Sequence, residues 1–144
     1  MDQKLTDRIR NFLAGNALFA GSGATPGQLA EAETQLSIKL DADYREFIAL
    51  FGGSYVGIEI YGFNNCEMLS TETVVDLTIS FRRDYQAAGC WPILAQSCVI
   101  SITGSGDPVV LDPQGRIRVY YHDNNEEETV AESFQELIAS CLPD

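Results

Sequence analysis

The spacing of apolar residues changes half-way along the chain, and this change constrains the fold more than any other feature. In the first half they recur three and four residues apart, as on one helix face; Tyr44, Phe47, Ile48 and Phe51 are an example. In the second half they alternate with polar residues, as along a half-buried strand. Helices followed by consecutive strands predict an α+β fold, with an antiparallel, mixed-order sheet of about five to six strands packed against several helices.

Capping signals set where the predicted helices begin. Thr25 and Gln28 have the spacing of a capping box, as do Ser133 and Glu136, and Asp41 suits an N-cap. The predicted helices span residues 2–13, 25–36, 41–51, 71–86 and 133–141.

Short turns separate the predicted strands of the second half. Glycine-containing turns at 103–107 and 113–115 indicate successive hairpins, which predict an antiparallel meander. Residues 123–128 are predicted to form an acidic loop. The predicted strands span residues 55–62, 91–95, 98–102, 109–112 and 116–122.

The chain of 144 residues is long enough for one complete core and contains no internal repeat. We therefore expect a single domain over residues 1–144, in which residues 1–24 form an N-terminal helix and a flexible connector. No apolar run reaches the ~18 residues of a membrane helix. The first residues also lack the pattern of a signal peptide, so we expect a cytoplasmic protein.

The residue types that form metal and catalytic sites are sparse. Four cysteines without a C-x-x-C spacing and one histidine do not suit a zinc site, so the cysteines are interpreted as small core residues. Gly104 and Gly106 flank a turn between strands, which is not the context of a phosphate loop. His122 precedes Asp123, but no nucleophile is placed beside them by the sequence. We expect no cofactor, no metal and no enzymatic activity.

The charge is strongly negative, because nine basic residues stand against 21 acidic ones, for a net charge of −12. This disfavours nucleic acids and anionic membranes as partners and favours a basic protein. We expect a monomer or a weak dimer. The candidate partner-binding residues are acidic residues near turns and on exposed faces: Glu67, Asp76, Asp84, Asp107, Asp123, Glu126, Glu127 and Glu128.

Three stretches in order resemble the SUKH superfamily, which is named after yeast cell-wall-assembly regulators of the Smi/Knr type. The first comprises residues 28–33 and 40–48 and ends in Phe51-Gly52-Gly53, where Asp41-Ala42 and Phe51 depart from the usual family residues. The second comprises residues 91–95 and 106–112, and the third residues 130–138.

The resemblance implies an immunity protein, which binds a cognate polymorphic toxin domain, often a nuclease or deaminase, and blocks it without catalysis or cofactor. One alternative is a regulatory scaffold module like the cell-wall regulators. A second alternative is a small-molecule-binding domain that uses the concave face of the sheet with Trp91 and Tyr61.

Overall fold

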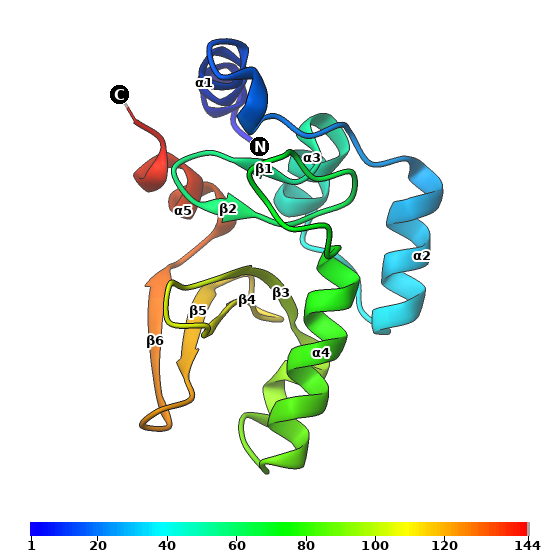
Figure 1. Cartoon of the computed structure of the whole chain (residues 1–144), viewed down its shortest axis with the longest axis vertical. Coiled ribbons are helices and arrows are strands. Elements are labelled where there is room, and N and C mark those ends of the chain that lie inside the picture. Colours follow the sequence, from blue (N-terminus) through cyan, green and yellow to red (C-terminus); the bar gives the residue numbers. More distant parts are fainter. Residues whose placement is uncertain (144) are drawn as a thin grey trace.

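The computed structural model describes residues 1–143, and within them it contains five α-helices and two antiparallel sheets (Figure 1). The predicted α+β class is confirmed. The α-helices are α1 (Gln3–Ala14), α2 (Pro26–Leu36), α3 (Ala42–Phe51), α4 (Val74–Ala87) and α5 (Phe134–Cys141), and the 3-10 helices are η1 (Ala17–Phe19) and η2 (Pro92–Gln96). The strands are β1 (Ser54–Tyr55), β2 (Glu59–Ile60), β3 (Cys98–Ile102), β4 (Pro108–Leu111), β5 (Ile117–Tyr121) and β6 (Glu126–Ala131).

The strands form two small sheets instead of one sheet of five to six strands. β1 and β2 pair as a hairpin, and the other four form a meander in the order β3-β4-β5-β6. The predicted strand at 55–62 is interrupted because Gly57, with φ of 89°, turns the chain. The predicted strand at 91–95 is wrong, since Trp91 has φ of 43° and Pro92 begins a 3-10 helix. The predicted loop at 123–128 is also wrong in its second half, which belongs to β6.

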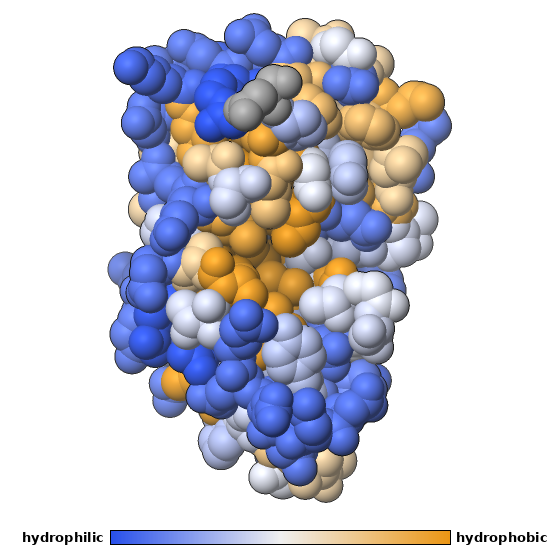
Figure 2. Space-filling view, turned by 90° about the vertical axis from the view of Figure 1, so that its left-hand side faces the viewer, coloured by the Kyte–Doolittle hydropathy of each residue, from blue (hydrophilic) through white to orange (hydrophobic). Residues whose placement is uncertain are grey.

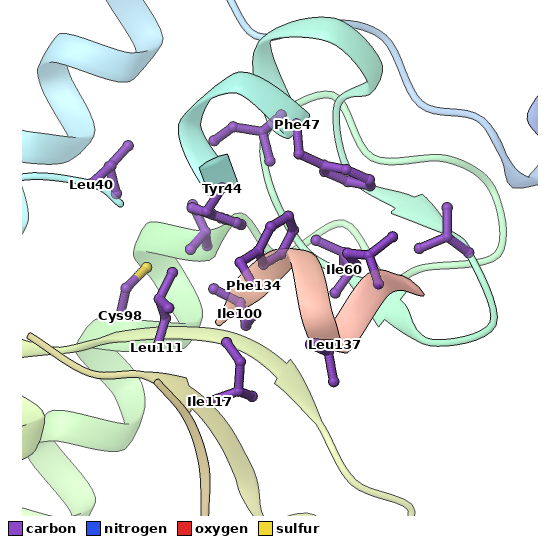
Figure 3. Packing of buried hydrophobic residues seen from close by; sticks show 14 of the residues in the cluster. Leu40, Tyr44, Phe47, Ile60, Cys98, Ile100, Leu111, Ile117, Phe134 and Leu137 are labelled. Atoms are coloured by element: carbon purple, nitrogen blue, oxygen red, sulfur yellow. The ribbon is translucent and has the colours of Figure 1, made fainter. Parts of the chain in front are cut away.

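Both faces of β3, β4 and β5 are covered by apolar packing. Val99, Val110 and Tyr120 belong to a cluster that includes residues of α4. The other face, with Ile100 and Ile117, packs beneath α3 and α5 (Figure 3). The central strands therefore lie between two apolar layers, and the β3 edge is occupied, because the N–H of Tyr61 donates to the carbonyl of Ile100.

Phe134 lies at the centre of the larger cluster. Its ring is 1% exposed, and its centroid lies 5.5 Å from those of Tyr44 and Phe47, both edge-on. Tyr44 is fully buried, and its hydroxyl donates a hydrogen bond of 2.6 Å to the carbonyl of Tyr61. This packing joins α3, α5 and the chain after β2.

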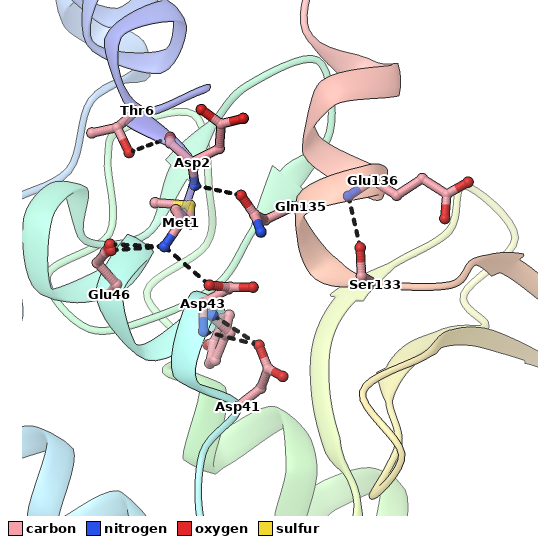
Figure 4. A network of polar contacts seen from close by, with 10 residues as sticks. Met1, Asp2, Thr6, Asp41, Asp43, Glu46, Ser133, Gln135 and Glu136 are labelled. Carbon is pink, nitrogen blue, oxygen red and sulfur yellow. Dashed lines mark hydrogen bonds and ion pairs between the residues drawn. The ribbon is translucent and has the colours of Figure 1, made fainter. Parts of the chain in front are cut away.

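The helix caps explain why the helices begin where they do. Thr25 and Gln28 form the predicted capping box, and Asp41 accepts hydrogen bonds from the first turn of α3. α4 begins later than predicted, because Thr73 caps it with Asp76 in a second capping box. Ser133 accepts from the N–H of Glu136 as predicted (Figure 4), whereas the Glu136 carboxylate accepts from the N–H of Glu132.

Backbone hydrogen bonds tie the segment at 21–24, which the sequence predicts to be a connector, to two other parts of the chain. Ser22 donates to the carbonyl of Asn64, and Ala24 donates to the carbonyl of Ile48. Gly52, with φ of 66°, packs so closely that an added Cβ would lie 2.0 Å from the carbonyl oxygen of Ser22. A side chain at this position is therefore excluded by both conformation and space.

Arg82 joins three segments from its place on α4. Its guanidinium donates hydrogen bonds of 2.9 Å to the carbonyls of Leu36 and Leu94 and of 3.0 Å to that of Ser97. The carbonyl of Leu36 is at the end of α2, where helical carbonyls lack intrahelical partners. One side chain thus satisfies acceptors at the end of α2, in η2 and before β3.

The amino-terminal residues connect α1 to α3 and α5. The ammonium group of Met1 lies 3.1 Å from carboxylate oxygens of Asp43 and Glu46, and the N–H of Asp2 donates to Gln135 (Figure 4). Hydrogen bonds to these carboxylates raise the pKa of the ammonium group, so it stays charged at neutral pH.

The four cysteines, all free, divide into two buried and two partly exposed residues. Cys66 and Cys98 are core residues, as predicted, whereas Cys90 and Cys141 are not fully buried. Burial raises the pKa of the Cys98 thiol to about 12, which keeps it uncharged.

Candidate partner-binding surface

β6 is the edge strand of the sheet, and its outer side is open. It pairs only with β5 within residues 1–143, and Figure 1 shows it at the left margin of the molecule. Glu126, Glu127 and Glu128 are exposed, and Val130 is 42% exposed. An exposed edge strand of this kind presents both side chains and backbone groups to a partner.

The hydrogen-bond pattern of β5 determines which backbone groups of β6 face outward. Directly before β5 the carbonyl of Arg116 accepts from the N–H of Asp112, and directly after it the N–H of His122 donates to the side chain of Asp107, so the even-numbered residues direct their backbone toward β4. Successive residues of an antiparallel strand direct their backbone N–H and C=O groups to opposite sides, so Val119 and Tyr121 direct these groups toward β6. Their register partners are Glu128 and Glu126.

It follows that Glu127 and Thr129 direct their N–H and C=O groups away from the sheet. Among the described residues, no hydrogen bond outside the β5–β6 ladder uses these groups. The register shifts between Ile117 and Arg118 of β5, so the regular outer edge ends near Val130.

The three glutamates of β6 differ in how far their charge is compensated. Arg118 donates a hydrogen bond of 2.6 Å to Glu127. The hydroxyl of Tyr121 donates one of 2.8 Å to Glu128, and this bond raises the pKa of the tyrosine. The carboxylate of Glu126 forms no hydrogen bond or ion pair with residues 1–143. Two uncompensated negative charges therefore lie two residues apart, on the same face as Tyr121.

His122, at the end of β5, lies between two carboxylates. Its Nδ1 atom pairs with Asp107, and its Nε2 atom lies 3.1 Å from Asp123. Asp107 is 3% exposed and also accepts from the Thr103 hydroxyl at 3.3 Å. Burial by itself would raise the pKa of Asp107, but hydrogen bonds from the backbone and ring of His122 outweigh it and lower that pKa.

The eight residues proposed from the sequence do not form one site. Asp123 and the three β6 glutamates lie together and are exposed. Asp107 lies beside them but is buried, so its carboxylate is not available to a partner. The remaining three lie on or before α4: Glu67 precedes the helix, Asp76 caps its first turn, and Asp84 pairs with Arg83 at 3.6 Å.

Apolar residues adjoin the acidic edge. Figure 2 shows the face that carries β6 and α5, with hydrophilic residues over its lower end and an apolar hollow at mid-height, where the sheet meets α5. Tyr121, Arg118 and Val130 were not predicted from the sequence to be surface residues. Their alternation along the two strands was visible, but the pairing of β5 with β6 was not.

The chain matches one family over almost its whole length. The family model SUKH_5, described as SMI1-KNR4 cell-wall, matches residues 5–143. The chain belongs to the SUKH family. No curated protein matches it.

The SUKH chain also has one pocket beside Trp91. It has a volume of about 300 Å³ and is lined by residues of α4, of η2 and of the chain between them, including Arg82 and Trp91. Tyr61, the other residue proposed for a small ligand, is 5% exposed and does not line this pocket.

No cluster of three or more His, Cys, Asp or Glu side chains in residues 1–143 of this SUKH protein could hold a metal ion. No described helix combines the length and apolar character needed to cross a membrane.

Replacing Asp107 with asparagine is expected to lower the free energy of unfolding at pH 7 by about 1–3 kcal/mol, because a buried carboxylate loses its charged hydrogen bonds. The pKa of Asp107 lies below its ordinary value of 3.8, so the stabilising contribution is present above 3.8 and is lost as the pH falls through the folded-state pKa. The unmodified SUKH protein should thus lose stability in acid more steeply than D107N. Urea unfolding at pH 7, 5 and 3 measures this.

Asp123→Asn is the matched control, because Asp123 contacts the other ring nitrogen of His122 but its side chain is 80% exposed. Its effect at pH 7 should stay below about 0.5 kcal/mol. Parallel pH profiles for D107N and the unmodified protein would contradict the assignment of the acid sensitivity to Asp107.

Proposed function

We propose that this SUKH protein is an immunity protein, which binds a cognate toxin domain and neutralises it by covering its catalytic surface. SUKH membership is consistent with an immunity-type or SMI1/KNR4-like protein. The observation that carries the proposal is the acidic edge of β6 beside an apolar hollow. Interfaces commonly combine an apolar centre with a polar rim.

The charge of the protein supports a basic partner. With a net charge of −12, it would accelerate encounter with a positively charged domain, such as one that acts on nucleic acid. Neutralisation by coverage requires neither a reaction nor a cofactor, and the protein would act in the cytoplasm. The proposed contacts are Asp123, Glu126, Glu127 and Glu128.

Co-expression with candidate toxin domains tests the proposal. The candidates are the carboxy-terminal domains of large secreted proteins encoded beside this gene. We expect one of them to arrest growth alone, to be tolerated with this protein, and to co-purify with it as a stable complex. Failure of every neighbouring domain to be neutralised would contradict the proposal.

Reversing the two uncompensated charges with Glu126→Lys and Glu128→Lys is expected to slow association with the toxin domain at low salt by about tenfold or more. The dissociation rate should change less, because long-range attraction acts on encounter. Stopped-flow or surface-plasmon kinetics at several salt concentrations measures both rates.

The control variant carries Asp7→Lys and Glu31→Lys, which change the net charge equally on α1 and α2, away from β6 (Figure 1). If both variants slow association equally, the effect comes from net charge and not from β6. If neither does, β6 lies outside the interface.

A regulatory scaffold is the second candidate, and the cell-wall description of the family model favours it. A scaffold would bind cellular partners in the absence of any toxin gene. An isolated gene, together with the failed co-expression above, would favour this function.

A further inference from the structure

We propose that the outer edge of β6 binds an extended, basic segment of the partner protein as an added strand of the sheet. The proposal rests on the proposed function for the identity of the partner, but not for the binding mode. It joins two properties of β6: unpaired backbone groups on its outer side, and uncompensated negative charges on one face.

The backbone groups provide the attachment. Glu127 and Thr129 direct N–H and C=O groups outward, which is the arrangement that an incoming strand requires. Neither residue is buried: Glu127 is exposed and Thr129 is half-buried. An added strand would pair with them just as β5 pairs with the inner side of β6.

The charges determine which strand is accepted. Glu127 is paired with Arg118, whereas Glu126 and Glu128 have no cationic partner within residues 1–143. These two side chains are two residues apart and so lie on one face. A partner strand with Lys or Arg at alternate positions would place its cations opposite them, and cross-strand pairs of opposite charge stabilise such pairing.

The same charges disfavour a second copy of this chain as the occupant. Antiparallel pairing of β6 with another β6 would bring the three consecutive glutamates of both copies to one interface. Like charges on neighbouring strands are destabilising, and natural sheets use charged edges to prevent such pairing. The negative charges of β6 thus disfavour pairing with the β6 strand of a second copy and favour pairing with a basic strand.

The first test uses a nine-residue probe peptide with alternating lysine and valine, blocked at both ends. On binding, hydrogen exchange is expected to slow at least tenfold at the amides of Glu127 and Thr129 and to change little in α1. A peptide with glutamate in place of lysine should not bind. The lysine peptide with every backbone nitrogen methylated should not bind either, because it keeps its charge but cannot form a ladder. Equal binding of the methylated peptide, or no binding of any peptide, would overturn the proposal.

The second test uses Thr129→Pro, which removes an outward N–H but no backbone hydrogen bond to β5; its side chain also loses the hydroxyl to which Arg118 of β5 donates. It should weaken peptide binding at least tenfold. Thr129→Val is the matched control, since it also loses the hydroxyl bonded to Arg118 but keeps the N–H; its binding should change less than threefold. Circular dichroism and thermal unfolding establish that both variants fold, and the methylated peptide tests the proposal on the unmodified protein if the proline variant does not.

The outcomes separate the binding mode from the function. Neutralisation of a toxin domain that is unaffected by Thr129→Pro would overturn strand addition and leave the immunity function standing. Peptide binding with protected amides, but no neutralised toxin, would overturn the immunity function alone. A concentration-dependent dimer, with protection of Glu127 and Thr129 in the absence of peptide, would show a second copy at this edge and overturn the proposal.

Discussion

Replacing Phe134 with alanine is expected to lower the free energy of unfolding by about 3–5 kcal/mol. The ring is 1% exposed and packs edge-on against Tyr44 and Phe47, so its removal leaves a cavity between α3 and α5. The neighbouring side chains belong to two helices and a sheet, which limits how far the cavity can collapse. Urea unfolding followed by circular dichroism at 25 °C measures the loss.

Phe134→Leu is the control for this prediction. Leucine keeps apolar contact with the same cluster and loses mainly the aromatic pairs, so its effect should be less than half as large. A loss below about 1 kcal/mol for the alanine variant would contradict the central position of Phe134.

Replacing Arg82 with methionine is expected to lower the free energy of unfolding by about 2–4 kcal/mol. The change keeps an apolar stem of similar length but leaves the carbonyls of Leu36, Leu94 and Ser97 without their shared donor. Because these carbonyls belong to α2, η2 and the start of β3, exchange of nearby amides should also accelerate. Urea unfolding and hydrogen exchange measure the two effects.

Arg83→Met is a closely matched control, because Arg83 is the next residue on α4, its side chain is 72% exposed, and it pairs with Asp84 at 3.6 Å. Such a surface pair contributes little, so a change below about 0.5 kcal/mol is expected. Arg82→Lys should resemble the methionine variant, because one ammonium group cannot span three separate carbonyls. Equal stability of R82M and R83M would contradict the bridging role of Arg82.

The helices could be predicted from the sequence because their signals are local. The capping residues at Thr25 and Asp41 act within one turn, and the apolar spacing of α3 agrees with them. The segment that begins at Trp91 could not be predicted, because the positive φ of Trp91 and the 3-10 helix after it are imposed by packing. The centroid of the Trp91 ring lies 5.1 Å from that of Tyr85 and 5.3 Å from that of Tyr120.

The candidate surface was predictable in composition but not in geometry. Consecutive glutamates have a low propensity for strands. The edge strand β6 accepts them because its outer side is unpaired and its side chains reach solvent on both of its faces. The burial of Asp107 could not be anticipated either. Its partner His122 is 15 residues away and reaches it only through the pairing of β4 with β5.

The position of β6 separates the proposed binding surface from the residues that keep the protein folded. Both faces of β3, β4 and β5 contribute to the two apolar clusters, whereas of the β6 residues only Ala131 belongs to either. The side chains at the other five positions of β6 lie outside both clusters. Related proteins could therefore change the partner that they bind through substitutions in one short strand, without first gaining additional folding stability.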